Sequence, residues 1–188
     1  MHNIVAVLKK QLKDTLHNKT VLIQFVMFPA MTLIMNSAVD IPGMPENFFV
    51  ELFATMYIGM APLTSMAAIL SEEKEKNTLR VLILSNVKPH EYLLGVGSYV
   101  WSACMLGGGA ICAAGGYGPR ASAAFMGVLA AGILTSLLIG AAIGIWSKTQ
   151  MMATSVAVPV MMVFSFVPML ALFNSGIEKA ARFFRCRC

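Results

Sequence analysis

Charged residues are scarce in this chain of 188 residues, of which 12% are charged and 57% are hydrophobic. A soluble domain needs far more polar side chains to cover its surface, so this composition excludes one. The stretches between the hydrophobic runs are also too short to form a separate domain. We therefore predict a single membrane domain over residues 1–188, surrounded mainly by lipid.

Motifs for disulfide bonds, metal binding or nucleotide binding are also lacking. Cys104 and Cys112 fall in one apolar run, and Cys186 and Cys188 form a lone C-x-C pair, so neither a disulfide framework nor a metal site is predicted. No G-x-x-x-x-G-K-[ST] motif is present, and the glycines at 107–109 and 115–116 lack the lysine of a phosphate-binding loop. We expect no enzyme activity, no cofactor in this chain and no nucleic-acid partner.

What the chain does contain is five long apolar runs. Each is close to the 20 or so residues that a helix needs to cross a bilayer, and each is too long and too uniform for a barrel strand. Backbone groups in lipid must be paired internally, which favours helices. The predicted fold is an all-α integral membrane protein with five transmembrane helices, at residues 20–38, 48–70, 92–114, 121–146 and 151–173.

The first 19 residues predict an amphipathic helix that lies on the membrane surface. Apolar residues recur there at steps of three and four, with lysines between them, as in Ile4, Leu8, Leu12 and Leu16. A frayed basic leader is the alternative. Both interpretations place the N-terminus in the cytoplasm, because clustered lysines favour the anionic inner surface of the plasma membrane.

The distribution of Lys and Arg predicts the orientation of the spans. With a cytoplasmic N-terminus, nine of these residues before the end of the fifth span lie inside, and Arg120 alone lies outside. The tail at residues 174–188 then falls outside, although it carries four more basic residues. Either a sixth helix is missing, which we favour, or one run is re-entrant near residues 107–116 and returns the tail to the cytoplasm.

The cytoplasmic loop at residues 71–91 is the most specific segment. Ser71 suits a helix N-cap, Glu72 and Glu73 would follow in the first turn, and Glu72 can pair with Lys76. Asn77 tolerates a left-handed backbone and therefore predicts a break.

A second short helix is expected after that break. Leu79, Leu82 and Ile83 would form its apolar face, and Pro89 would end it. A solvated loop that serves only topology is the alternative to this helix, break, helix pattern.

At these residues the chain resembles the type-2 family of ATP-binding-cassette (ABC) exporter permeases, whose first cytoplasmic loop resembles E-x-E-x-G-T-L-E-x-L-L-x-x-P. The matching positions are Glu73, Glu75, Thr78, Leu79, Leu82, Ile83 and Pro89. Asn77 stands where glycine is usual, and Arg80 stands where an acid is common. The resemblance runs from the N-terminus to about Ile177, although the family has six spans.

The resemblance implies that residues 71–91 dock as a coupling helix on a separate cytoplasmic ATPase, which binds ATP and magnesium. It also implies a second permease chain, as a homodimer or heterodimer. The residues implied to transmit the motion of the ATPase lie in this loop: Glu72, Glu73, Glu75, Thr78, Leu79, Arg80, Leu82, Ile83 and Pro89.

Small residues stand four apart in the fourth run, at Gly132, Ser136, Gly140 and Gly144. Such a ladder lets another helix backbone approach closely. The partner is either a helix of the same chain, which we favour, or a second copy of the chain.

The spans hold almost no ionisable residues, since Glu51 lies near the outer end of the second one. An ion-coupled mechanism is therefore disfavoured. We expect a hydrophobic or amphipathic substrate, such as a drug, a peptide antibiotic or a lipid-like molecule. The alternative function is that of a truncated or non-transporting membrane subunit, either an assembly or a sensor partner.

Overall fold

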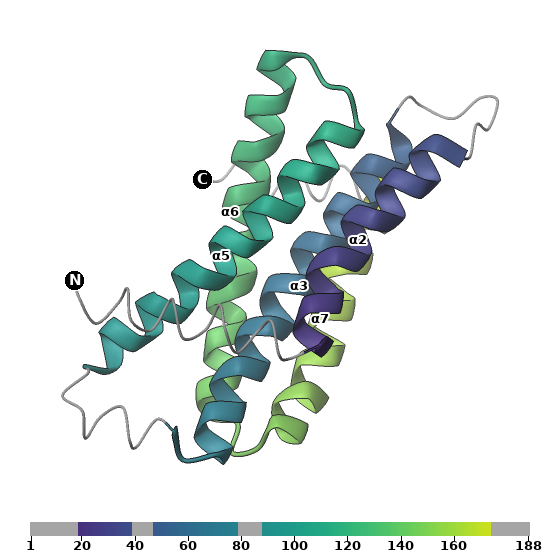
Figure 1. Ribbon diagram of the computed structural model, residues 1–188. Helices are drawn as coiled ribbons and strands as arrows, with labels where there is room; N and C mark the ends of the chain where they lie inside the picture. The colour runs from purple at the N-terminus through teal and green to yellow at the C-terminus, as the bar shows by residue number, and fades with distance from the viewer. Residues whose placement is uncertain (1–18, 39–46, 79–87, 174–188) are drawn as a thin grey trace, which may run out of the picture.

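A computed structural model describes residues 19–38, 47–78 and 88–173 of the chain, with the side chains of residues 22–38, 47–78 and 88–166. Of the predicted interfacial helix at residues 1–19, all but Lys19 lies outside the described residues, as does the tail at 174–188. The described part consists of helices joined by turns (Figure 1). The prediction of an all-α membrane fold is confirmed. The five helices are α2 (Lys19–Ala38), α3 (Phe48–Glu75), α5 (Pro89–Ala114), α6 (Pro119–Trp146) and α7 (Gln150–Phe173).

Three of these helices, α3, α5 and α6, are long and apolar enough to cross a membrane by length and composition. In the described parts of α2 and α7 the apolar stretches, Leu22–Ala38 and Gln150–Phe166, are shorter. The helices agree with the predicted spans except at α3, which continues for five residues beyond the predicted limit at Leu70. α5 is uninterrupted through Gly107 to Gly109, so the helix shows no re-entrant break there.

Proline opens two of the helices. Pro89 and Pro119 each occupy the first helical position after a residue with extended backbone angles. The missing N–H of proline costs nothing at this position, because the first N–H groups of a helix have no partner within it. The tight turn that joins α5 to α6 contains Gly116, whose φ of 59° suits a residue without a Cβ.

α3 lies at the centre of the bundle and contacts each of the other four described helices. Its buried residues Val50, Ala54, Tyr57 and Ala61 follow three- and four-residue steps and form the main core with α2, α5 and α6. In Figure 1 the hairpin of α5 and α6 stands on one side of α3, with α2 and α7 on the other. Any movement of α3 therefore reaches every described helix.

The end of the bundle at the start of α3 and α6 carries little charge. Tyr117, in the turn before α6, stacks on Phe125 with ring centroids 5.4 Å apart. Burial raises the pKa of the Tyr117 phenol above its usual value, and the nearby carboxylate of Glu51 raises it further. The phenol therefore stays neutral at physiological pH and adds no charge to this end.

Candidate functional site

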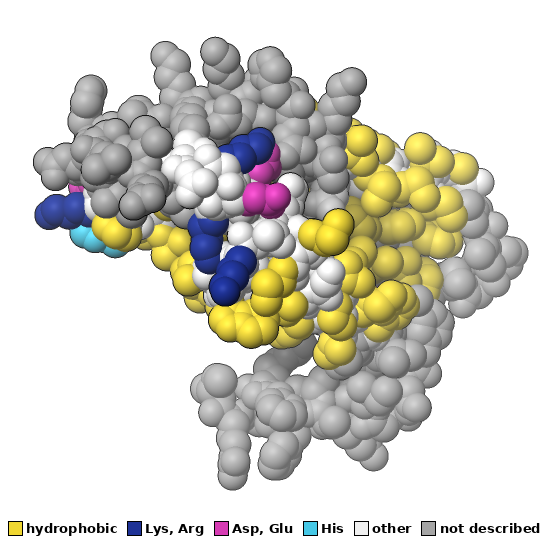
Figure 2. Space-filling view, turned by 90° about the horizontal axis from the view of Figure 1, so that it is seen from below, with side chains coloured by type: hydrophobic (Ala, Val, Ile, Leu, Met, Phe, Trp, Pro, Cys, Tyr) yellow, Lys and Arg dark blue, Asp and Glu magenta, His cyan; other side chains and the backbone are white. Residues whose placement is uncertain are grey.

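The candidate site is the end of the bundle where α3 and α6 finish and α5 and α7 begin. Among the side chains that the structure describes, every charged one except those of Glu51 and Arg120 belongs to this end. Figure 2 views the molecule from this end and shows the basic and acidic groups gathered amid the apolar surface. Within the described ranges, no three His, Cys, Asp or Glu residues come together as metal ligands would.

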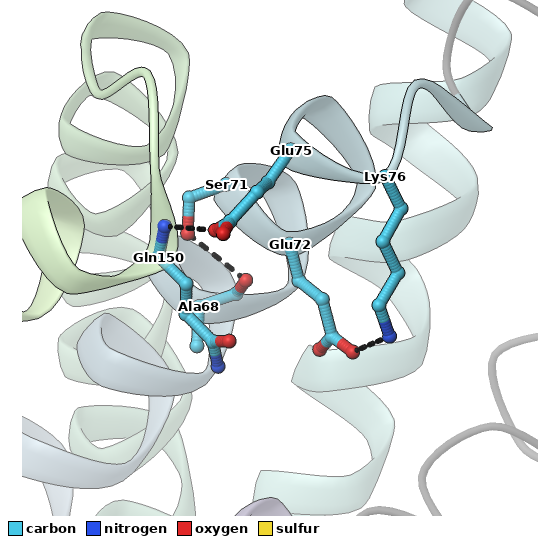
Figure 3. A network of polar contacts seen from close by, with 6 residues as sticks. All are labelled: Ala68, Ser71, Glu72, Glu75, Lys76 and Gln150. Atoms are coloured by element: carbon cyan, nitrogen blue, oxygen red, sulfur yellow. Dashed lines mark hydrogen bonds and ion pairs between the residues drawn. The ribbon is translucent and has the colours of Figure 1, made fainter.

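The predicted separate helix with Ser71 as its N-cap is wrong, because α3 runs without interruption from the membrane core to Glu75. The Ser71 hydroxyl lies inside this helix and donates to the carbonyl oxygen of Ala67 at 2.7 Å. It also lies 3.0 Å from the carbonyl oxygen of Ala68 (Figure 3). A serine bonded to the preceding turn has no need of the capping position. The charged segment is thus a continuous extension of a transmembrane helix.

The predicted ion pair between Glu72 and Lys76 is present, and the Lys76 Nζ lies 2.5 Å from the Glu72 Oε1 (Figure 3). The predicted dipole role of Glu72 and Glu73 is wrong, since they lie at the C-terminal end of α3, where the helix dipole disfavours acids. The Lys76 side chain is 66% exposed, so this pair contributes only about 0.3–0.5 kcal/mol. Its main effect is to shield an acid at an unfavourable helix end.

α3 ends at the predicted break. Asn77 has a φ of 55°, as expected for a left-handed residue after a helix. The Lys76 N–H donates to the Glu72 carbonyl at 2.9 Å, and the Asn77 N–H donates to the Lys74 carbonyl at 3.1 Å. Glycine is usual at this position in the loop of the ABC exporter permeases that the chain resembles. Asparagine can replace it here because its short polar side chain tolerates a left-handed backbone conformation.

Two neighbouring side chains of α3 bind the turn between α6 and α7. The Lys74 ammonium donates to the carbonyls of Ile145 and Ser147, the latter at 2.6 Å, where α6 ends. The Glu75 carboxylate accepts a hydrogen bond from the backbone N–H of Gln150 at 2.8 Å, where α7 begins (Figure 3). We call this pair of contacts the Lys74–Glu75 clamp.

Each charge of the Lys74–Glu75 clamp matches the helix end that it meets. A cation lies at the C-terminus of α6, where carbonyls leave partial negative charge, and an anion lies at the N-terminus of α7, where N–H groups leave positive charge. The clamp therefore joins three helices at one end of the bundle. No local pattern indicates this role of Lys74, because its partners lie more than 70 residues away in the chain.

Glu73, predicted as a contact for a partner, is only 7% exposed. It faces the bundle and interacts electrostatically with the phenol of Tyr92, which is itself buried in the first turns of α5. Glu73 therefore links α3 to α5 within the chain. Glu75 and Thr78 are more accessible.

The remaining residues of the predicted coupling loop are placed as follows. Pro89 begins α5, and the short helix that it was predicted to end lies outside the described residues. Proline fits there because the first turn of a helix needs no N–H from that residue. Leu79, Arg80, Leu82 and Ile83 lie outside the described residues.

The small-residue ladder of α6 faces α3 of the same chain. A Cβ on Gly140 would strike the Leu63 carbonyl oxygen and lie 3.0 Å from the Leu63 Cα, and one on Gly144 would lie 2.8 Å from the Leu70 Cβ. Gly132 meets Ile58 of α3 in the same way, and Ser136 is buried. The backbones of α3 and α6 thus approach closely at these small residues. Such close packing makes many dispersion contacts, which hold helices together in lipid.

Comparison with known proteins agrees with this architecture. The family model described as ABC-2 family transporter protein matches residues 2–185, which is nearly the whole chain. No curated protein and no solved structure matches the chain. Members of this family are membrane components of transporters and generally work with a cytoplasmic ATPase. The chain therefore belongs to the ABC-2 family of transporter proteins, as a membrane-embedded permease.

Proposed function

We propose that this chain is the permease subunit of an exporter in the plasma membrane, driven by ATP that a separate cytoplasmic subunit hydrolyses. The observation that carries the proposal is the family match over residues 2–185. The charged end of the bundle supports it, because a permease without an ATP site needs a surface on which an ATPase can act. In this proposal the working unit contains two permease chains and two ATPase chains.

The charged end is proposed to face the cytoplasm. Lys74, Lys76, Lys88 and Lys148 all belong to it, whereas Arg120 is the basic residue described at the opposite end. Positively charged ends of membrane helices are preferentially retained inside the cell. This orientation places the N-terminus inside and, with five spans, the C-terminus outside.

The Lys74–Glu75 clamp supports a specific route for coupling. A force on the segment after Glu75 would act on α3 as a rigid lever, since no break separates that residue from the membrane core. The clamp would carry the same force into the ends of α6 and α7, and the electrostatic contact of Glu73 with Tyr92 would carry it to α5. Four helices would then respond to a single contact with the ATPase.

The proposed substrate is hydrophobic or amphipathic. Within the described residues, charged side chains gather at the two ends of the bundle, and polar contacts in its middle are few, such as the hydrogen bond of Thr64 to Gln24 at 2.9 Å. A proton or ion relay needs ionisable groups at membrane depth. Transport of a small inorganic ion by the reconstituted complex, without transport of hydrophobic compounds, would contradict this proposal.

The test is a pull-down of the tagged chain from its own cells in mild detergent, with the retained proteins identified. The variant Leu79→Asp/Arg80→Glu changes the predicted coupling loop without touching the Lys74–Glu75 clamp. Arg120→Glu is the control, because it repeats the arginine-to-glutamate change of the loop variant at the opposite end of the bundle. We expect the native chain and the control to retain an ATPase and the loop variant to lose it. Equal retention by all three would disprove docking through this loop.

A further inference from the structure

An apolar groove of about 570 Å³ runs between α5 and α6, and Met66 of α3 also lines it. Small residues leave this space, namely Gly97 on α5 and Ala130, Ala131 and Ala141 on α6. The volume lies within the roughly 300–1,000 Å³ typical of sites for small molecules. Nothing in the family assignment accounts for it.

The length of the groove matches one leaflet of a bilayer. Its lining on α6 extends from Ala130 to Ala141, which is about 16 Å of helix. The hydrocarbon core of a bilayer is about 30 Å thick, so the groove covers about half of it. The Ser98 hydroxyl in the lining already donates to the Gly95 carbonyl at 3.0 Å and demands no polar ligand. An extended hydrocarbon chain fits such a surface.

The groove lies in the half of the hairpin that ends at the positively charged end of the bundle. His90 stands one turn before Leu94 on the same face of α5, and Lys88 precedes it, with both side chains exposed. Glu91, the acid nearest to them, turns back toward the backbone N–H of Lys88, at 3.4 Å.

From this juxtaposition we propose that the groove binds an anionic phospholipid, with an acyl chain along Gly97 and Ala131 and the headgroup at Lys88. A lysine beside the membrane surface attracts an anionic headgroup. The wall residues Leu94 and Leu138 are 61% and 60% exposed, so a lipid covers apolar surface that packing within the chain leaves bare. The proposal does not depend on the ATPase.

Tryptophan fluorescence offers a direct test, since the chain contains two tryptophans and Trp101 lines the groove. In the variant Trp146→Phe, the full-length protein reports on the groove alone. It is reconstituted with lipids brominated on the acyl chains, either phosphatidylglycerol or phosphatidylcholine, which quench an indole on contact. We expect the apparent affinity for phosphatidylglycerol, measured by quenching, to be about fivefold higher than that for phosphatidylcholine. This factor corresponds to the roughly 1 kcal/mol that one basic side chain contributes near an anionic headgroup.

Three further variants, each in the Trp146→Phe background, separate a bound lipid from general contact with the bilayer. Lys88→Gln should remove most of the preference for phosphatidylglycerol while quenching by both lipids persists. Gly97→Leu should fill the groove and abolish the preference, whereas Gly109→Leu on the same helix, where a Cβ meets nothing within 4 Å, should preserve it. A Cβ on Gly97 meets only Leu137, at an ordinary 3.6 Å, so the fold accommodates this position.

Equal quenching by the two lipids in the Trp146→Phe protein would overturn the proposal. So would a preference that survives both Lys88→Gln and Gly97→Leu, because the charge would then be recognised elsewhere. If Gly97→Leu does not give a monodisperse protein, Lys88→Gln decides the outcome alone, since this exposed side chain has no part in packing the core.

Discussion

Replacing Lys74 by methionine tests the Lys74–Glu75 clamp most directly. Methionine keeps the length and the apolar stem of lysine but has no donor group. The variant therefore loses both hydrogen bonds to the end of α6, at Ile145 and Ser147, while the packing of the stem is kept. The C-terminus of α6 also loses the cation that matches its dipole.

The expected loss of stability follows from these contacts. A hydrogen bond to a charged group contributes about 1.5–3 kcal/mol, and a cation at a helix C-terminus about 0.3–1 kcal/mol. Lys74 is only partly buried, so water replaces some of what is lost, and we expect about 1–2 kcal/mol for the whole change. Lys76→Met is the matched control two residues away. It should lower the free energy of unfolding by about 0.3–0.5 kcal/mol, because it removes only the exposed ion pair with Glu72.

Unfolding of the purified chain by sodium dodecyl sulfate, followed by tryptophan fluorescence, measures both variants. Trp146 is the last residue of α6 and reports on the end that the clamp holds. In the assembled complex, Lys74→Met should still retain the ATPase but reduce transport per ATP hydrolysed, because it removes the hydrogen bonds from α3 to the end of α6 and leaves Leu79 and Arg80 unchanged. Equal effects of the two substitutions on stability and transport would refute the clamp.

Two further predictions concern packing in the membrane. Gly140→Ala should destabilise the chain by about 1–3 kcal/mol, because its Cβ strikes the backbone of Leu63, whereas Gly127→Ala on the same helix, where a Cβ meets nothing within 4 Å, should be neutral or stabilising. Tyr57→Phe should cost about 0.5–1.5 kcal/mol, since the buried phenol donates to the Cys104 carbonyl at 3.2 Å. Detergent unfolding measures all three, and equal stability of the two glycine variants would contradict the close approach of α3 and α6.

Much of the fold could be predicted from the sequence because length and hydropathy are local properties. The predicted spans agree with α2, α5, α6 and α7 to within a few residues at each end. The left-handed residue at Asn77 was also predictable, since a short polar side chain after a charged helical turn favours that conformation. Ser71 was assigned wrongly because a serine suits both an N-cap and the interior of a helix, and only its neighbours decide between them.

Local patterns alone made this chain an α-helical membrane protein, with its charged residues at the helix ends and a break after α3. They did not indicate which helix faces meet. In lipid both the buried and the exposed faces of a helix are apolar, so the usual contrast between them is absent. Only the tertiary structure placed Lys74 and Glu75 at the ends of α6 and α7, turned Glu73 inward and opened a groove beside Gly97. These features depend on residues far apart in the chain, whose meeting is decided by the close packing of α3 against its neighbours.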